Sequence, residues 1–329
     1  MLRVLSVLSV LSVLSIVATP FLQVGAAVGQ PSYPSRQLAI MVPYPAGSNA
    51  DTIARLLADK LAPTLKQPVI VENRGGGATV PGTAQMLQAP ADGHTLLQSG
   101  TNTNINPLLG VQAPYNVERD LVPVLLLVTF PGVLVVHPSV PAQNVTELVA
   151  LAKSKPDQLT YSSPGTGNFA HLAMEQFKQL IGMQIAHVPF RGLGSAMIGL
   201  LRNDVQITVA DIPGAIEHVR SGKLRALAQT GSTRMPQLPD LPTLAEAGVP
   251  GYEAAGFLGI WARAGTPAEV LAVLNREINQ ALTSPELNSY AVNRGMLIAG
   301  GTPAKFVKFL DHDRAIWSRV ITEAGIKLD

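Results

Sequence analysis

The sequence predicts an α/β protein with two halves of similar design. From residue 37 onward, strand-like and helix-like segments alternate along the chain, which is the pattern of α/β architecture. In each half a short strand leads into an amphipathic helix through a loop of small residues, at 46–50 and again at 162–168. The length of 329 residues allows two domains, and a composition of 47% hydrophobic and 14% charged residues is typical of a folded globular protein.

The N-terminus has the features of a secretory signal peptide. Arg3 supplies a positive charge, residues 4–17 are all Val, Leu, Ile or Ser, and small residues follow at 24–27. The apolar run is shorter than the roughly 18 residues that a membrane-spanning helix needs. We therefore expect a signal peptide over residues 1–26, cleaved near Ala26, and a mature protein in the periplasm. The chain has no cysteine, which excludes a lipid-anchored lipoprotein, disulfides and thiolate metal ligands.

The first half is predicted to contain strands that alternate with helices. Apolar residues at helical spacing over 53–65 predict a first helix with one buried face, and Asn49 or Asp51 is expected to cap its N-terminus. A second helix is expected at 82–88, after a glycine-rich turn. The strands of this half are expected at 37–42, 69–71 and 94–98.

The second half is predicted to repeat this design. Residues 159–182 contain a short strand, the second small-residue loop and a helix. Two longer helices, at 267–283 and 303–324, flank a strand-like segment at 295–299. The other expected elements are strands at 132–136, 184–189, 205–209 and 224–229, and helices at 145–153, 196–201 and 212–221.

The two small-residue loops are candidate anion sites. Open α/β sheets bind ligands at the carboxyl ends of their strands, where these loops lie. A helix N-terminus presents unpaired backbone N–H groups and about half a positive charge, and small residues let an anion approach the backbone closely. Each loop alone also fits an ordinary strand-to-helix turn. A matching pair, one in each half, favours a cleft that holds an anion from both sides.

Three side chains near the second loop are open to two interpretations. Arg191 follows a predicted strand and either contacts a carboxylate or is a solvated charge. His171, in the first turn of the helix after the loop, either donates to an anion or packs against the sheet. Asp211 either accepts a hydrogen bond from a ligand or caps the helix at 212–221.

Other classes of function find little support in the sequence. A net charge of +2 and 5% aromatic residues argue against nucleic-acid binding. The chain contains no G-x-S-x-G, P-loop, H-E-x-x-H or G-x-G-x-x-G motif, and its histidines are too scattered to predict a metal site. We therefore expect no cofactor, no metal and no enzymatic activity. An exported hydrolase would need Ser48 or Ser163 beside a histidine, and the sequence shows no such pairing.

Short motifs in a fixed order resemble those of a known family. The motifs are Tyr33 to Arg36, Val42 to Gly47 with Asp51, Pro68 to Arg74, Ala91 to Leu97, His137 to Pro141, Tyr161 to Leu172, Gly222 to Ala228, Pro239 to Thr243 with Glu246 to Gly248, and Ala264 to Pro267. Over essentially the whole mature chain they are similar to the periplasmic substrate-binding proteins of tripartite tricarboxylate transporters, called Bug receptors.

The resemblance implies a two-lobed, type II periplasmic-binding-protein fold with the ligand cleft between the lobes. Residues 33–128 plus 254–329 would form lobe 1, and residues 129–253 would form lobe 2. The resemblance also implies a monomeric receptor, without an ATPase, that binds a di- or tricarboxylate, an amino acid or an aromatic acid and delivers it to a membrane permease. An alternative role is a sensor that presents the loaded protein to a membrane histidine kinase.

The resemblance assigns one carboxylate of the ligand to the first loop and the other end of the ligand to the second. In the first loop, the family usually has two or three glycines before the aspartate, whereas this chain has Ser48-Asn49-Ala50. The usual Asp-Asn at the second-lobe strand end is Asp211-Ile212. These departures leave the identity of the ligand open. The candidate ligand-binding residues are Tyr44, Ala46, Gly47, Ser48, Asn49, Asp51, Thr101, Ser163, Gly165, Thr166, Gly167, His171, Arg191 and Asp211.

Overall fold

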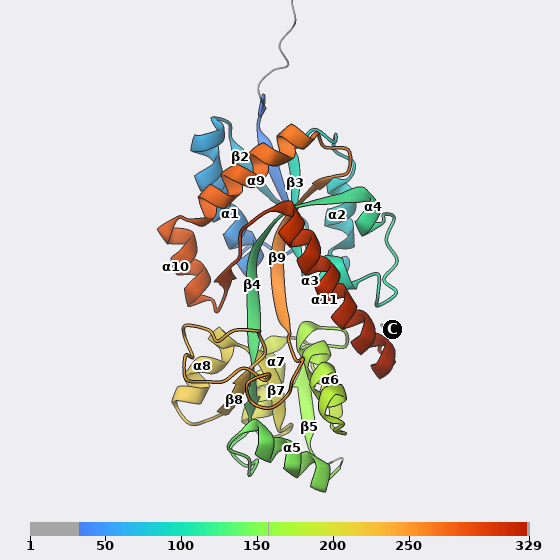
Figure 1. The fold of residues 1–329 in the computed structure, drawn as a ribbon, viewed down its shortest axis with the longest axis vertical. Helices are drawn as coiled ribbons and strands as arrows, with labels where there is room; N and C mark the ends of the chain where they lie inside the picture. The colour runs from blue at the N-terminus through green and yellow to red at the C-terminus, as the bar shows by residue number, and fades with distance from the viewer. Residues whose placement is uncertain (1–32, 157, 328–329) are drawn as a thin grey trace, which may run out of the picture. The chain divides into compact units, whose positions relative to one another are not determined.

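The computed structural model describes residues 33–156 and 158–327. The expected signal peptide, residues 1–26, lies outside the described residues. Among the helices that are described, none has both the length and the apolar character needed to cross a bilayer. The described chain forms a mixed α/β fold around one ten-stranded sheet (Figure 1).

The first part of the sheet combines parallel strands with one long antiparallel pair. β1 (Leu38–Val42) lies between β2 (Val69–Asn73) and β3 (Thr95–Gly100), and both neighbours run parallel to it. β9 (Ala255–Arg263) is antiparallel to β3 and also to β4 (Leu121–Val136). In Figure 1, β4 and β9 run along the centre of the fold and connect the first part of the sheet to the second.

The second part of the sheet is built on the far end of β4. Residues 132–136 of that strand pair antiparallel with β7 (Ile207–Asp211), and residues 133–136 also pair antiparallel with β8 (Arg225–Gln229). β5 (Thr160–Ser163) follows β7, and β6 (Ala186–Pro189) follows β5, with these three strands parallel. Each part of the sheet therefore has parallel strands whose carboxyl ends lead into helices.

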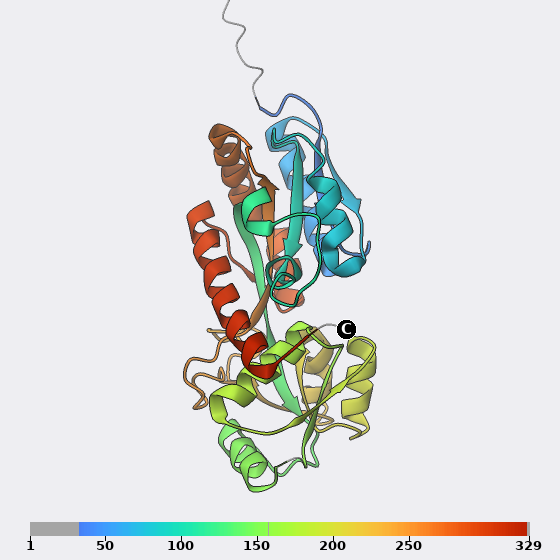
Figure 2. The ribbon, with the colours of Figure 1, turned by 90° about the vertical axis from the view of Figure 1, so that its right-hand side faces the viewer.

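Helices surround both parts of the sheet. Figure 2 shows α11 (Pro303–Ala324) beside β4, and its Val320 carbonyl accepts a hydrogen bond of 3.0 Å from Gln179 of α6 (Phe169–Ile181). A short strand, β10 (Leu297–Ile298), pairs with β4. The helices are α1 (Asn49–Leu65), α2 (Val80–Met86), α3 (Thr101–Ile105), α4 (Val117–Asp120), α5 (Val145–Ser154), α6 (Phe169–Ile181), α7 (Leu193–Leu201), α8 (Ile212–Arg220), α9 (Ala268–Leu282), α10 (Pro285–Asn293) and α11 (Pro303–Ala324), with a 3-10 turn, η1, at Gly77–Thr79.

Each part of the sheet has an apolar core of its own. Ile53 and Leu57 of α1 are fully buried against α9, on the face that the helical spacing predicted. Phe177 of α6 and Trp317 of α11 are buried in the core of the second part. Because α1 and α6 are each held by such a core, the loops that lead into these helices end at fixed positions.

The structure corrects several predictions about individual elements. β4 begins at Leu121, well before the predicted strand at 132–136, because Pro123 and Pro131 break the sequence pattern but are accommodated in the strand, which has register shifts near Pro123 and Leu126. β9 and α10 were not predicted. The N-cap of α1 is Ser48, whose Oγ accepts from the Asp51 N–H at 3.2 Å, so neither Asn49 nor Asp51 caps this helix.

Candidate functional site

A cavity of about 320 Å³ is lined by residues from both parts of the sheet. Tyr44, the start of α1 and α3 contribute from the first part, and the starts of α6 and α8 contribute from the second. The middle of β4, at residues 130–132, and the segment 294–296 also line the cavity, as do Leu193, the end of β7 and Phe257 and Leu258 of β9. The cavity thus lies where chain segments far apart in the sequence converge.

The N-termini of α1, α6 and α8 line this cavity, together with the start of the short helix α3 and the first residue of α7. α1 begins after Ser48, and α6 begins after Asn168, whose Oδ1 accepts from the Ala170 N–H at 2.9 Å. α8 begins after Asp211, which makes no side-chain capping hydrogen bond. The first backbone N–H groups of a helix have no partner within the helix, and the helix dipole adds positive potential there. The arrangement therefore favours an anion in the cavity.

Two charged side chains, Arg294 and Asp211, line the cavity. The Arg294 guanidinium carbon lies 5.6 Å from the centre of the Tyr290 ring, and the Tyr290 hydroxyl donates to Asn49 Oδ1 at 2.9 Å. Within the described residues, Arg294 forms no salt bridge. Arg294 is solvent-exposed, and it is connected to the start of α1 through Tyr290 and Asn49.

The structure brings part of the predicted site together at the cavity and leaves the rest behind or outside it. Arg191 lies exposed on the turn between β6 and α7, and Thr166 is exposed on its loop. Burial raises the pKa of the Tyr44 phenol, so this cavity residue stays protonated as a hydrogen-bond donor. The predicted residues that line the cavity are Tyr44, Ser48, Asn49, Thr101, Gly167 and Asp211; those that do not are Ala46, Gly47, Asp51, Ser163, Gly165, Thr166, His171 and Arg191.

Asp51 supports the first loop from within the protein. Its carboxylate accepts from the Gly47 N–H at 2.8 Å and from Arg55 Nε at 3.1 Å, and the residue is only 4% exposed. Burial by itself would raise the pKa of Asp51, but hydrogen bonds from Arg55, the Gly47 N–H and Asn73 hold it below its usual value. Asp51 is thus an ionised group that fixes the loop backbone.

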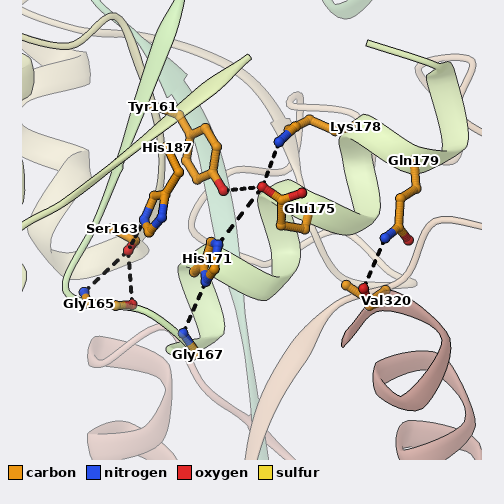
Figure 3. A network of polar contacts seen from close by, with 10 residues as sticks. All are labelled: Tyr161, Ser163, Gly165, Gly167, His171, Glu175, Lys178, Gln179, His187 and Val320. Carbon is orange, nitrogen blue, oxygen red and sulfur yellow. Dashed lines mark hydrogen bonds and ion pairs between the residues drawn. The ribbon is translucent and has the colours of Figure 1, made fainter. Parts of the chain in front are cut away.

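A buried polar network supports the second loop (Figure 3). His171 Nδ1 accepts from the Gly167 N–H at 3.0 Å, and its ring stacks on that of His187 with the ring centres 3.9 Å apart. Glu175 accepts from Lys178 Nζ at 2.6 Å and from the Tyr161 hydroxyl. Burial, with the neighbouring His187, lowers the pKa of His171 to about 4, so the ring is neutral and Nδ1 is free to accept.

The same network contains the serine–histidine pair that the sequence did not reveal. Ser163 Oγ lies 2.7 Å from His187 Nε2, and this hydroxyl also contacts both the N–H and the carbonyl of Gly165. Ser163 is fully buried and does not line the cavity. A nucleophile must reach its substrate, so this geometry indicates that Ser163 positions the loop backbone.

Comparison with known proteins places this chain in one family. The family model described as the tripartite tricarboxylate transporter family receptor matches residues 53–326. The chain belongs to this receptor family. A similar relative is protein BugT of Bordetella pertussis, which is 35% identical over 307 residues, covering 93% of this chain and 94% of BugT. The family predicted from the sequence is therefore confirmed.

Solved structures similar to this receptor have the same fold. Rpa4515 of R. palustris, determined with adipate, is 31% identical with a TM-score of 0.74, and the match covers 90% of this chain and 99% of that one. A TctC solute binding protein from Polaromonas is 26% identical with a TM-score of 0.81, over 89% of this chain and 100% of that one. The two-lobed α/β fold expected from the sequence is confirmed by these likenesses.

The receptor's cavity also contains residues that sequence reasoning missed. Arg294 directly follows α10, a helix that was not predicted, and reaches the cavity only because the C-terminal segment folds back beside α1. Phe130 and Phe257 come from β4 and β9, the strands that were wholly or partly missed. No local sequence signal marks these residues, since their role depends on long-range pairing.

Proposed function

We propose that this receptor binds a small carboxylate in the cavity and delivers it to a membrane permease of the tripartite tricarboxylate type. The observation that carries the proposal is the convergence of Arg294 and the N-termini of α1, α6 and α8 on one cavity. The adipate found with the relative Rpa4515 is a ligand of the same chemical class. Binding through backbone donors requires no reactive group, so we propose that the protein is not an enzyme.

We also propose that two lobes close over the ligand. Lobe 1 is residues 33–128 plus 254–329, and lobe 2 is residues 129–253. The pairing of β4 supports this division, because the strand changes its partners from β9 to β7 between residues 131 and 132. Residues at the starts of α1 and α6 then hold the ligand from opposite lobes.

Within the cleft, we assign direct ligand contact to five of the six predicted residues that line the cavity, all except Asp211. Tyr44, Ser48, Asn49 and Thr101 act from lobe 1, while Gly167 acts from lobe 2. The remaining predicted loop residues act by holding the backbone in place. Asp51 and Gly47 do so in the first loop, as described above.

We further propose that the protein works in the periplasm as a monomer after cleavage of residues 1–26 near Ala26. The apolar N-terminal run and the family of the mature chain support this location. Gene deletions distinguish transport from the alternative role, signalling through a membrane histidine kinase. Loss of the permease abolishes uptake of the ligand, and loss of a candidate kinase leaves uptake intact if transport is the role.

The proposed function is tested by thermal unfolding of the exported protein with a panel of mono-, di- and tricarboxylates, amino acids and aromatic acids. A ligand at about 100 times its Kd stabilises the folded state by roughly 2.7 kcal/mol. For a domain of 150–250 residues, each kcal/mol raises Tm by about 2–4 °C. A clear shift with an acid, and none with its uncharged amide, supports the proposal. No shift with any acid would contradict it.

A further inference from the structure

We infer that the preferred ligand is an acid with a bulky apolar body, whose carboxylate pairs with Arg294. The inference rests on the proposed function, because it takes the cavity to be the carboxylate site. It narrows the ligand class from organic acids in general to phenyl- or long-alkyl-substituted acids, and it assigns a specificity-determining residue outside both small-residue loops.

The carboxylate of the ligand is expected to bind at Arg294. Arg294 is the one basic side chain among the described residues that line the cavity, and it forms no salt bridge with any of them. Its guanidinium group lies over the Tyr290 ring, whose hydroxyl is bonded to Asn49 in the first turn of α1. Arginine binds carboxylate through two parallel hydrogen bonds. A carboxylate here would meet both the guanidinium group and the unpaired N–H groups of α1.

The body of the ligand is defined by apolar side chains from several elements. Phe130 of β4, Phe169 of α6, Phe257 of β9 and Met296 all line the cavity. Phe169 is half-buried and held edge-on against Trp317, with the ring centres 6.3 Å apart. Phe257 and Met296 are already buried, whereas Phe130 and Phe169 are partly exposed. Covering Phe130 and Phe169 with an apolar ligand removes hydrophobic surface from water, and aromatic rings favour an aromatic partner.

The remaining charge in the cavity disfavours a compact polar polyacid. Asp211 is the other charged lining residue, and it lies at the start of α8, where its carboxylate offsets the positive end of that helix. With the first carboxylate at Arg294 and the start of α1, a second carboxylate on a ligand too short to reach the start of α6 would lie against the apolar wall or approach Asp211. Both positions are unfavourable, because a charge loses its hydration at the first and meets a like charge at the second.

The experiment is isothermal titration of the exported protein with four probes and three variants. Phenylacetate and octanoate are the apolar acids, malate is the compact polar acid, and phenylacetamide is the uncharged counterpart of phenylacetate. Arg294→Gln removes the positive charge. Arg294→Lys keeps the charge but lacks the planar guanidinium group that makes two parallel hydrogen bonds. Arg319→Gln is the matched control, since Arg319 is exposed on α11 and does not line the cavity.

We expect phenylacetate or octanoate to bind at least 10-fold more tightly than malate, and phenylacetamide to bind weakly. Hydrogen bonds to a charged group are worth enough that Arg294→Gln should weaken phenylacetate binding by about 10- to 100-fold, with a smaller loss for Arg294→Lys and none for Arg319→Gln.

Tighter binding of malate would overturn the inferred ligand class while leaving the receptor function standing. Unchanged affinity in a folded Arg294→Gln protein would overturn the role of Arg294. Failure of every acid in this set and in the wider panel would overturn the proposed function itself.

Discussion

In the loop before α1, the Gly47 N–H donates to the Asp51 carboxylate at 2.8 Å, and in the loop before α6, the Gly167 N–H donates to His171 Nδ1 at 3.0 Å. In both loops the acceptor lies four residues after the glycine, and both glycines have positive φ, +79° and +73°. The two loops therefore share one backbone arrangement. They differ in the acceptor, which is an ionised carboxylate in the first and a neutral imidazole in the second.

Because the acceptors differ, the two loops respond to acid over different ranges of pH. The pKa of His171 is lowered in the folded protein, so its contribution to stability is fully present above about 6.5 and is lost as the pH falls toward 4. The pKa of Asp51 is also lowered, so its contribution is present above the unfolded value of 3.8 and is lost only at lower pH. Mild acid should therefore weaken the second loop and spare the first.

The largest expected effect is on stability in mild acid. Between pH 7 and pH 4.5, proton uptake by His171 in the unfolded state alone should reduce the free energy of unfolding by about 2 kcal/mol, and His187, whose pKa is also lowered, acts in the same direction. Urea unfolding at several pH values measures this loss. His171→Phe should flatten the profile, whereas the exposed control His312→Gln should not. A flat profile in the wild-type protein would contradict the assignment.

At neutral pH, replacing the imidazole of His171 measures how much its hydrogen bond to the Gly167 N–H contributes to the stability of the folded protein. His171→Phe keeps an aromatic ring against His187 but leaves the buried Gly167 N–H without an acceptor, which should cost about 1–3 kcal/mol. Hydrogen exchange at the Gly167 amide should accelerate in the variant, while exchange at Gly47 should stay unchanged. If hydrogen exchange accelerates at both amides, the two loops are not independent.

The corresponding change in the first loop should have a smaller effect. Asp51→Asn keeps the shape and one acceptor oxygen but removes the charge that pairs with Arg55, whose side chain is half exposed. We expect a loss of about 1 kcal/mol, because ion pairs with an exposed partner contribute little. Chemical denaturation at pH 7 checks this value. A loss above that of His171→Phe would reverse the ranking of the two loops.

The smallest expected effect tests the glycine of the first loop. A Cβ at Gly47 would meet no atom within 4 Å, so Gly47→Ala adds only the strain of a positive φ, on the order of 1 kcal/mol or less. Ligand affinity should change little, because Gly47 does not line the cavity. Titration calorimetry with the tightest acid of the panel measures the affinity. A complete loss of binding would place the ligand against Gly47 itself.

Local signals explain which elements the sequence predicted well. The units β1–α1 and β5–α6 were predicted because each combines a short strand, small loop residues and a helix with one apolar face within about 25 residues. β9 was missed because it is buried on both faces and so lacks the alternation of a half-exposed strand. The prolines at 123 and 131 concealed the first part of β4 in a similar way.

The site was only partly predictable for a different reason. The loop residues near Ser48 and Gly167 could be found because helix N-termini have a local signature. Arg294 reaches the cavity through the fold of the C-terminal segment, and His187 reaches Ser163 through the parallel register of β5 and β6. Contacts of this kind depend on strand pairing across the chain and leave no trace in local spacing.

The most direct test of the account is a crystal structure of the exported protein with the acid that gives the largest thermal shift. We expect a ligand carboxylate within hydrogen-bonding distance of the first N–H groups of α1 and of Arg294, with the ligand body against Phe130 and Phe169. A bound acid that contacts neither helix start, or that lies outside the cavity, would contradict the account.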